Sequence, residues 1–201
     1  MPLLTERQKK LLLQIARNAM TAAVERKPAQ ALPADGELCR PGGAFVTLHS
    51  ITTHGTSRLR GCIGQLPNEE PLIEVVAHCA GMAALEDPRF APVTSAELAG
   101  IQIEISVLSM PQDIRPEDIV PGKHGLLVSR GWQRGVLLPQ VAPQFGWSGL
   151  RFLEETCAKA GLPSRAWEDP ETRVQAFTAE VFSEADFNAR ETSKESYSIS
   201  T

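Results

Sequence analysis

The sequence predicts an α+β protein in which a mainly antiparallel sheet is flanked by helices. Two pairs of strand-like segments are each separated by a short turn, as in β-hairpins, which join antiparallel strands. Other segments have apolar residues at helical spacing, and residues 101–109 alternate apolar and polar side chains. Helices and hairpins of this kind in one chain are typical of the α+β fold class.

The first helix is expected from Thr5 to about Arg26. Thr5 and Gln8 have the spacing of a capping box, and an apolar stripe follows. The stripe consists of Leu11, Leu12, Ile15, Ala19 and Ala23. The next segment, KPAQALPADGELCRPGG, is rich in proline and glycine, so it is predicted to be a long connector that carries Cys39.

The first hairpin is expected from residues 44–50, AFVTLHS, and residues 57–64, SRLRGCIG, joined by ITTHGT. If the hairpin closes symmetrically about residues 52–54, three residues of the first strand face three of the second. These pairs are Phe45 with Cys62, Thr47 with Arg60, and His49 with Arg58.

Residues 68–85 are predicted to form the second helix, with Asn68 or Glu69 near its cap and Pro71 in its first turn. Its apolar stripe is Leu72, Val75, Val76, Cys79 and Ala83. Residues 101–109, IQIEISVLS, are expected to form a half-buried strand with one polar face.

The second hairpin is expected from LLVS and GVLLPQVA around RGWQRG, with Pro139 closing the outgoing strand. Ser148 can cap a helix that stops at Gly161 before Pro163. Residues 172–184 are predicted to be one last strand. Residues 188–201 are polar and have too few apolar side chains to pack, so a disordered tail is expected.

The chain of 201 residues is long enough for one domain or two small lobes with a core of their own. A formal charge of −4 does not indicate the positive surface that binding to nucleic acid or an anionic membrane requires, so a small-molecule or protein partner is expected. Neither a signal peptide nor a run of ~18 apolar residues is present, and we expect a cytoplasmic protein. Its cysteines are then expected to be free thiols: Cys39, Cys62, Cys79 and Cys157.

Cys62 lies in RLRGCIGQ, between Gly61 and Gly64. Strand alternation places Arg58, Arg60 and Cys62 on one face. Because a nearby guanidinium favours thiolate over thiol, Arg60 can activate Cys62 as a nucleophile. The alternative is that Cys62 packs as a small apolar residue, as most free cysteines do.

Four histidines are candidate bases for such a thiol: His49, His54, His78 and His124. Their spacing indicates no metal site, and His124, in a glycine-rich turn, is the best placed to line a cleft. No phosphate loop, dinucleotide fingerprint, serine elbow or iron–sulfur cysteine cluster is present, so no cofactor is predicted. An anionic ligand can instead be gathered by Arg89, Lys123, Arg130 and Arg134.

The motifs GAFVTLH, LRGCIG, PLIEVVAHCAGMAALEDPRF, IEISVLS and GVLLPQVA occur in this order, from about Leu11 through Phe182. In these motifs the chain resembles the AMMECR domain family, whose prokaryotic members are called AmmeMemoRadiSam system protein A. The resemblance implies a single domain over residues 1–187 with a larger lobe, a smaller lobe and a cleft between them. It also implies LRGCIG as the functional signature, matched here by Arg60, Gly61, Cys62 and Gly64, with Arg89, Pro139 and Gln140 in further motifs.

The family name implies two companions, a Memo-like protein and a radical SAM protein, but the family has no settled activity. Two alternatives therefore stay open for a cleft around Cys62. In an enzyme, Cys62 is the nucleophile, Arg60 lowers its pKa, and His124 or His49 is the base. In a binding module, Arg60 and Arg89 contact an anionic small molecule or a partner peptide while Cys62 packs, and Gly61, Gly64, Gln140 and His49 complete the site.

Overall fold

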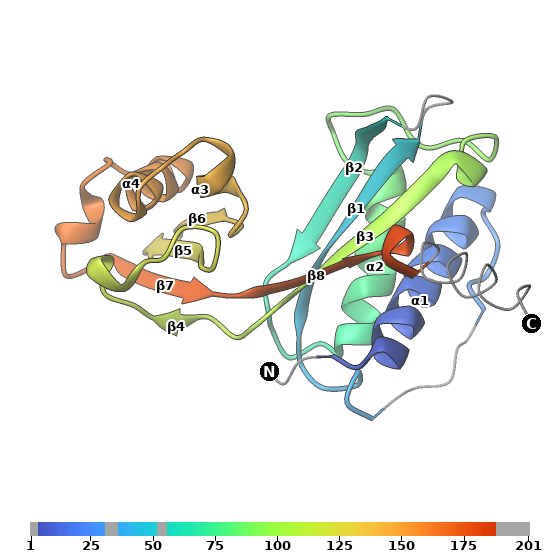
Figure 1. Ribbon diagram of the computed structural model, residues 1–201, viewed down its shortest axis with the longest axis horizontal. Coiled ribbons are helices and arrows are strands. Elements are labelled where there is room, and N and C mark those ends of the chain that lie inside the picture. The colour runs from blue at the N-terminus through green and yellow to red at the C-terminus, as the bar shows by residue number, and fades with distance from the viewer. Residues whose placement is uncertain (1–3, 31–35, 52–55, 188–201) are drawn as a thin grey trace, which may run out of the picture. The chain divides into compact units, whose positions relative to one another are not determined.

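The computed structural model describes residues 4–30, 36–51 and 56–187, which form two compact units (Figure 1). One unit contains the residues up to Val107 together with those from Glu180 onward, and the other is Leu108–Ala179. Each unit has its own four-stranded sheet and its own helices, which confirms the predicted α+β class. The predicted cleft between two lobes stays a prediction.

The first unit has a sheet with the strand order β2-β1-β3-β8. The strands are β1 (Gly43–Ile51), β2 (Ser57–Gln65), β3 (Ile101–Leu108) and β8 (Ala179–Ser183). Helices α1 (Glu6–Glu25) and α2 (Leu72–Leu85) lie together on one face, behind the sheet in Figure 1. Alternate strand residues such as Val46, Leu48, Ile103 and Ile105 are fully buried, because they point toward these helices.

The two helix starts in this unit are stabilised in different ways. Thr5 forms the predicted capping box with Gln8 at the start of α1. For α2 the cap is Pro71 and no side chain caps the helix. The helix therefore begins at Leu72 and not at residue 68 as predicted, and Pro71 precedes the first turn. Instead, the first backbone N–H groups of α2 donate to carbonyls of the connector, Leu72 to Arg40 at 2.9 Å and Ile73 to Leu38 at 3.0 Å.

The second unit has a sheet with the strand order β4-β7-β5-β6, paired antiparallel. The strands are β4 (Gln112–Asp113), β5 (Gly125–Arg130), β6 (Gln133–Leu137) and β7 (Arg173–Phe177), with helices α3 (Val141–Gln144) and α4 (Gly149–Lys159). Ser148 caps α4 as predicted. Phe152, Leu153 and Cys157 of α4 are fully buried in one cluster with Leu126 and Val128. Among the described residues there are also three short 3₁₀ helices, η1 (Leu98–Gly100) in the first unit and η2 (Pro116–Asp118) and η3 (Ala166–Glu168) in the second.

Two predicted strands differ from the structure. The single strand expected over residues 172–184 is two strands, β7 in the second unit and β8 in the first, separated at Thr178. Its apolar residues serve two cores, which alternation alone does not reveal. The outgoing strand of the second hairpin ends at Leu137, and residues 141–144 form α3.

Residues 52–55 of the first hairpin turn and the predicted tail, 188–201, lie outside the described residues. Within the described part of the chain, no helix has the length and apolar character needed to cross a membrane.

Candidate functional site

The hairpin of β1 and β2 is antiparallel as predicted, but its register differs from the symmetric one. Cys62 lies opposite Thr47, and Gly64 lies opposite Phe45. The register shifts between Leu48 and His49, because Arg60 has no partner on β1 and forms a β-bulge. The predicted pairing was therefore wrong at each position, and the bulge redirects the side chain of Arg60.

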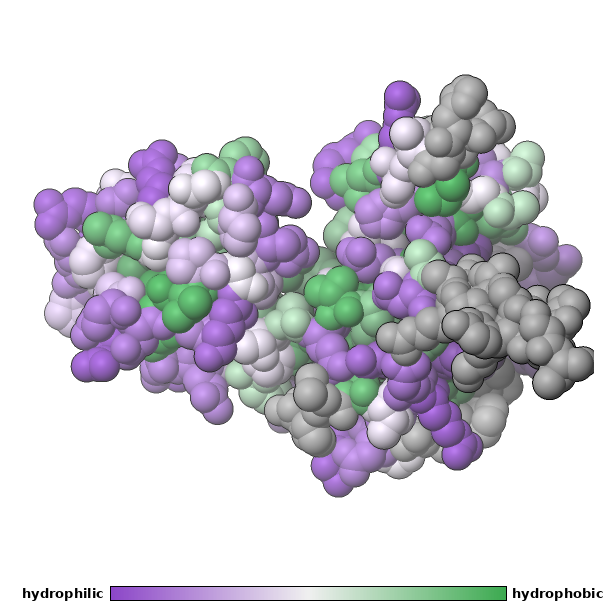
Figure 2. All heavy atoms as spheres, in the orientation of Figure 1, coloured by the Kyte–Doolittle hydropathy of each residue, from purple (hydrophilic) through white to green (hydrophobic). Residues whose placement is uncertain are grey.

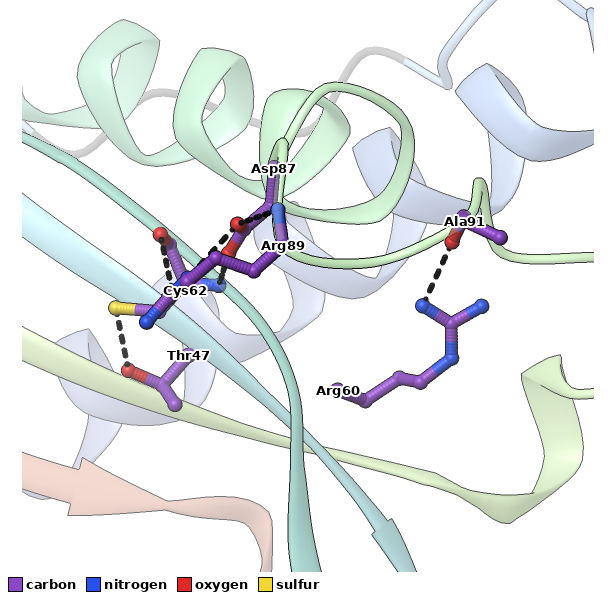
Figure 3. Close-up of polar contacts among 6 residues, drawn as sticks. All are labelled: Thr47, Arg60, Cys62, Asp87, Arg89 and Ala91. Carbon is purple, nitrogen blue, oxygen red and sulfur yellow. Dashed lines mark hydrogen bonds and ion pairs between the residues drawn. The ribbon is translucent and has the colours of Figure 1, made fainter.

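β2 is an edge strand, and the backbone of Cys62 is satisfied by side chains instead of by a neighbouring strand. Its N–H donates to Asp87 Oδ2 at 2.8 Å, and its carbonyl oxygen accepts from Arg89 Nη2 at 3.5 Å. Thr47 and Cys62 are therefore a non-hydrogen-bonded pair of the β1–β2 ladder: their backbone groups point away from each other, and their side chains lie close together. The Thr47 Oγ1 hydroxyl donates to Cys62 Sγ at 3.2 Å (Figure 3).

Asp87 and Arg89 form a half-buried ion pair beside this strand. Asp87 Oδ1 accepts from Arg89 Nε at 2.9 Å and Oδ2 accepts from Arg89 Nη2 at 2.7 Å, a bidentate geometry. The Asp87 side chain is only 2% exposed, whereas that of Arg89 is 55% exposed. The hydrogen bonds from Arg89 hold the pKa of Asp87 far below its usual value. A buried, ionised carboxylate therefore anchors the edge of β2.

Arg60 points away from Cys62 (Figure 3). Its Nε donates to Glu97 Oε1 at 2.8 Å and its Nη1 donates to the Ala91 carbonyl at 2.9 Å. The bond from Arg60 is the main reason that the pKa of Glu97 is lowered to about 2. Arg60 thus braces the loop of residues 91–97, and the prediction that it activates Cys62 is wrong.

The thiol of Cys62 has a raised pKa, the opposite of what was predicted. Burial is the largest cause, since a thiolate is poorly solvated there. The hydrogen bond from Thr47 and the charge of Arg89 act in the lowering direction, but they do not outweigh burial. Cys62 is therefore a protonated thiol at neutral pH.

The two glycines of the signature make room for protein groups. A Cβ atom on Gly61 would lie 2.1 Å from the carbonyl oxygen of Ala83, so β2 and α2 touch through their backbones. A Cβ atom on Gly64 would lie 2.2 Å from the ring of Phe45, its partner on β1. Both glycines are explained by packing.

The AMMECR1 family model matches residues 13–182, which include the residues of the site around Cys62. The chain belongs to the AMMECR1 family. It is 42% identical over 181 residues to a protein of Thermococcus gammatolerans, covering 86% of this chain and 88% of the relative. It is 40% identical over 180 residues to a protein of Aquifex aeolicus, covering 86% and 91%.

The fold of this chain is also similar to that of a solved structure. The crystal structure of an uncharacterised protein from Pyrococcus horikoshii has a TM-score of 0.76 and 40% sequence identity to this chain. The match covers 87% of this chain and 90% of that one. These relatives place the chain in the AMMECR1 family and assign no activity to it.

The predicted bases of this AMMECR1 chain lie in different places. His49 shares a face of β1 with Thr47, and its Nε2 atom is buried without a hydrogen-bond partner among the described residues. His124 lies in the second unit, where its Nδ1 accepts from the Val120 N–H at 3.2 Å and burial lowers its pKa. His54 lies outside the described residues, and His78 is exposed on α2.

The remaining predicted ligand residues belong to the second unit, whereas Arg89 belongs to the first. Gln140 lies at the start of α3 in the second unit, so its role, like that of His124, stays a prediction. Arg130 is paired with Asp169 at 3.1 Å in the same unit. The described residues contain no group of three histidine, cysteine, aspartate or glutamate side chains that could hold a metal ion.

Sequence reasoning missed Thr47, Asp87 and Glu97, which hold the signature residues in place. A usable signal existed for Asp87, because an acid lies two residues before Arg89 in EDPRF. No sequence pattern pointed to Glu97, which lies 37 residues from Arg60.

The four cysteines are expected to differ in alkylation rate, measured by mass spectrometry against pH. Cys39 is exposed and should react first. Cys62 should react more slowly, with a midpoint above the ~8.5 of an ordinary thiol. Cys79, whose pKa burial raises to about 11, and fully buried Cys157 should react only on unfolding. A midpoint for Cys62 well below that of an ordinary thiol would contradict the protonated state.

Proposed function

We propose that this protein is a binding module that recognises an anionic group of a small molecule at Arg89, beside Cys62. The observation that carries the proposal is the unequal burial of the Asp87–Arg89 pair. The carboxylate is sequestered, while more than half of the guanidinium side chain faces solvent in a fixed orientation. A guanidinium held in this way can offer its remaining N–H groups to a carboxylate or phosphate without first losing rotational freedom.

The local charge also supports an anionic ligand. The Asp87 carboxylate accepts hydrogen bonds from the backbone N–H of Cys62 and from both the backbone and the side chain of Arg89. Its negative charge is therefore compensated by protein donors. Arg60 is 15% exposed and neutralised by Glu97. Arg89 is therefore the positive group of this cluster that remains accessible, and Cys62 packs below it.

A cysteine-dependent reaction is the second candidate, because Thr47 donates a hydrogen bond to Cys62 Sγ and thus favours a thiolate. Burial has the larger effect and keeps the thiol protonated, which favours the binding function. A cytoplasmic location and cooperation with Memo-like and radical SAM companions belong to the same proposal.

The proposal is tested by titrating the protein with succinate and, separately, with inorganic phosphate while recording ¹H–¹⁵N spectra. Saturable shifts are expected for the Arg89 Nε–H and for the backbone amide of Cys62, because the two groups share Asp87. Raising the salt concentration should weaken binding, since the contact is electrostatic and partly exposed.

The control is the double variant Asp87→Asn with Arg89→Gln. It removes the guanidinium while Asn keeps an oxygen acceptor for the Cys62 N–H, so the fold should persist and the shifts should vanish. If both anions shift the double variant as they shift the wild type, or if neither binds the wild type, the proposed function is wrong.

A further inference from the structure

The edge strand β6 of the second unit leaves the backbone groups of two alternate residues, Arg134 and Val136, without a partner. Ladder hydrogen bonds in antiparallel strands alternate, and the two-residue turn makes Arg130 and Gln133 a bonded pair. Arg134 and Val136 therefore direct their N–H and carbonyl groups away from β5. None of these four groups is bonded to another described residue of the chain.

The alternation is confirmed on the other side of the sheet. Leu127 and Ser129 lie opposite Val136 and Arg134, and they use their backbone groups to bond β7 instead. The same alternation holds in β7. The carbonyl oxygen of Val174 points away from β5, since it accepts a hydrogen bond from the backbone N–H of Ile114, beside β4, at 3.2 Å. β6 is thus one edge of this sheet, and the two-residue strand β4 is the other.

Two side chains at this edge, those of Trp132 and Arg134, face solvent. Trp132 is 92% exposed at the hairpin tip, after Gly131 with a φ of 57°, which fits a tight turn with glycine at its first corner. Arg134 is exposed, and among the described residues it has no ion pair. Two other arginines of this sheet do form ion pairs, Arg130 with Asp169 and Arg173 with Asp113. The face of this unit shown in Figure 2 carries hydrophilic residues and apolar patches, and Trp132 is the most exposed large apolar side chain among the described residues.

We propose that β6 binds an extended peptide segment of a partner protein by adding it to the sheet as a further strand. The peptide carries an acidic residue opposite Arg134 and apolar residues opposite Val136 and Trp132. Backbone hydrogen bonds at Arg134 and Val136 supply the affinity, and the side chains supply the choice of peptide. This surface belongs to the second unit and is independent of the function proposed for Arg89.

A second copy of this chain fits the edge less well than a peptide does. A Cβ atom on Gly135 would lie 2.5 Å from Ala160 N and from the Thr156 carbonyl oxygen, so α4 rests directly on β6. Two copies paired through β6 would bring two such helices over strands only about 4.8 Å apart, whereas packed helices need about 8–10 Å. An extended segment carries no helix and avoids this clash.

The test uses a capped peptide of the order Val-Thr-Glu-Thr-Leu-Thr, titrated into the full chain and followed by ¹H–¹⁵N spectra and Trp132 fluorescence. In antiparallel pairing its valine, glutamate and leucine face Val136, Arg134 and Trp132. Saturable shifts are expected at the amides of Arg134 and Val136. N-methylation of the glutamate amide, which points at the edge, should weaken binding at least about fivefold, as expected for one lost hydrogen bond. N-methylation of the central threonine, whose amide points away, should have little effect.

Two protein variants complete the test. Val136→Pro removes only an outward N–H, so the hairpin should stay folded while binding is lost. Arg134→Glu should reject the parent peptide and bind the same peptide with lysine in place of glutamate. Binding that ignores the N-methyl position and the charge exchange, or no saturable shift at all, would overturn the proposal. Shifts at Arg134 and Val136 that grow with protein concentration alone would overturn it in favour of self-association.

Discussion

Replacing Arg89 by alanine is expected to lower the free energy of unfolding by about 3 kcal/mol, as measured by urea denaturation at neutral pH. The reason is that Asp87, 2% exposed, would keep a buried charge without its main partner. In an Asp87→Asn background the same replacement should cost less than about 1 kcal/mol, because no buried charge remains. Equal losses in the two backgrounds would show that Arg89 acts through its own packing and that the ion pair is unimportant.

The same pair predicts how stability depends on pH. The folded pKa of Asp87 lies far below the ~3.9 of an unfolded aspartate, so folding favours the ionised form. The stabilisation is therefore fully present above about pH 4 and is lost as the pH falls toward the folded pKa. In the Asp87→Asn variant the free energy of unfolding should depend less on pH below about pH 4. An unchanged pH dependence in that variant would contradict the lowered pKa of Asp87.

Gly61→Ala is expected to destabilise the protein by about 3 kcal/mol, near the upper end for overpacking a core position. The added Cβ would lie 2.1 Å from the backbone oxygen of Ala83, and a helix carbonyl cannot move without shifting α2. The measurement is the same urea titration, with the helix content checked by circular dichroism.

Gly100→Ala is the matched control for Gly61→Ala. A Cβ atom at Gly100 would meet no other atom within 4 Å, and its effect should stay within about 0.5 kcal/mol. Gly64→Ala should fall between the two, because the ring of Phe45 is a side chain that can rotate aside. If Gly61→Ala is as mild as Gly100→Ala, the signature glycine is not required for the contact of β2 with α2.

Cys62 illustrates how far the candidate site could be predicted. The motif comparison selected Cys62, Arg60, Gly61 and Arg89, and these residues do cluster around β2 with Asp87. Their roles were not predictable from strand alternation, because a single bulged residue at Arg60 ends the simple alternation along β2. Arg89, expected only as a ligand contact, is the positive charge that acts on the pKa of the thiol, in the lowering direction.

Features that depend on neighbours a few residues apart could be predicted from the sequence. The capping box at Thr5, the cap at Ser148, the buried stripe of α2 and the alternating strand β3 follow from local spacing. The partners of Cys62 and Arg60 could not be predicted in this way, because Asp87 bonds to Cys62 across 25 residues and Glu97 bonds to Arg60 across 37. Only the tertiary structure decided that residues 173–183 divide between two sheets, because a strand's alternation shows that one face is buried and not which core buries it.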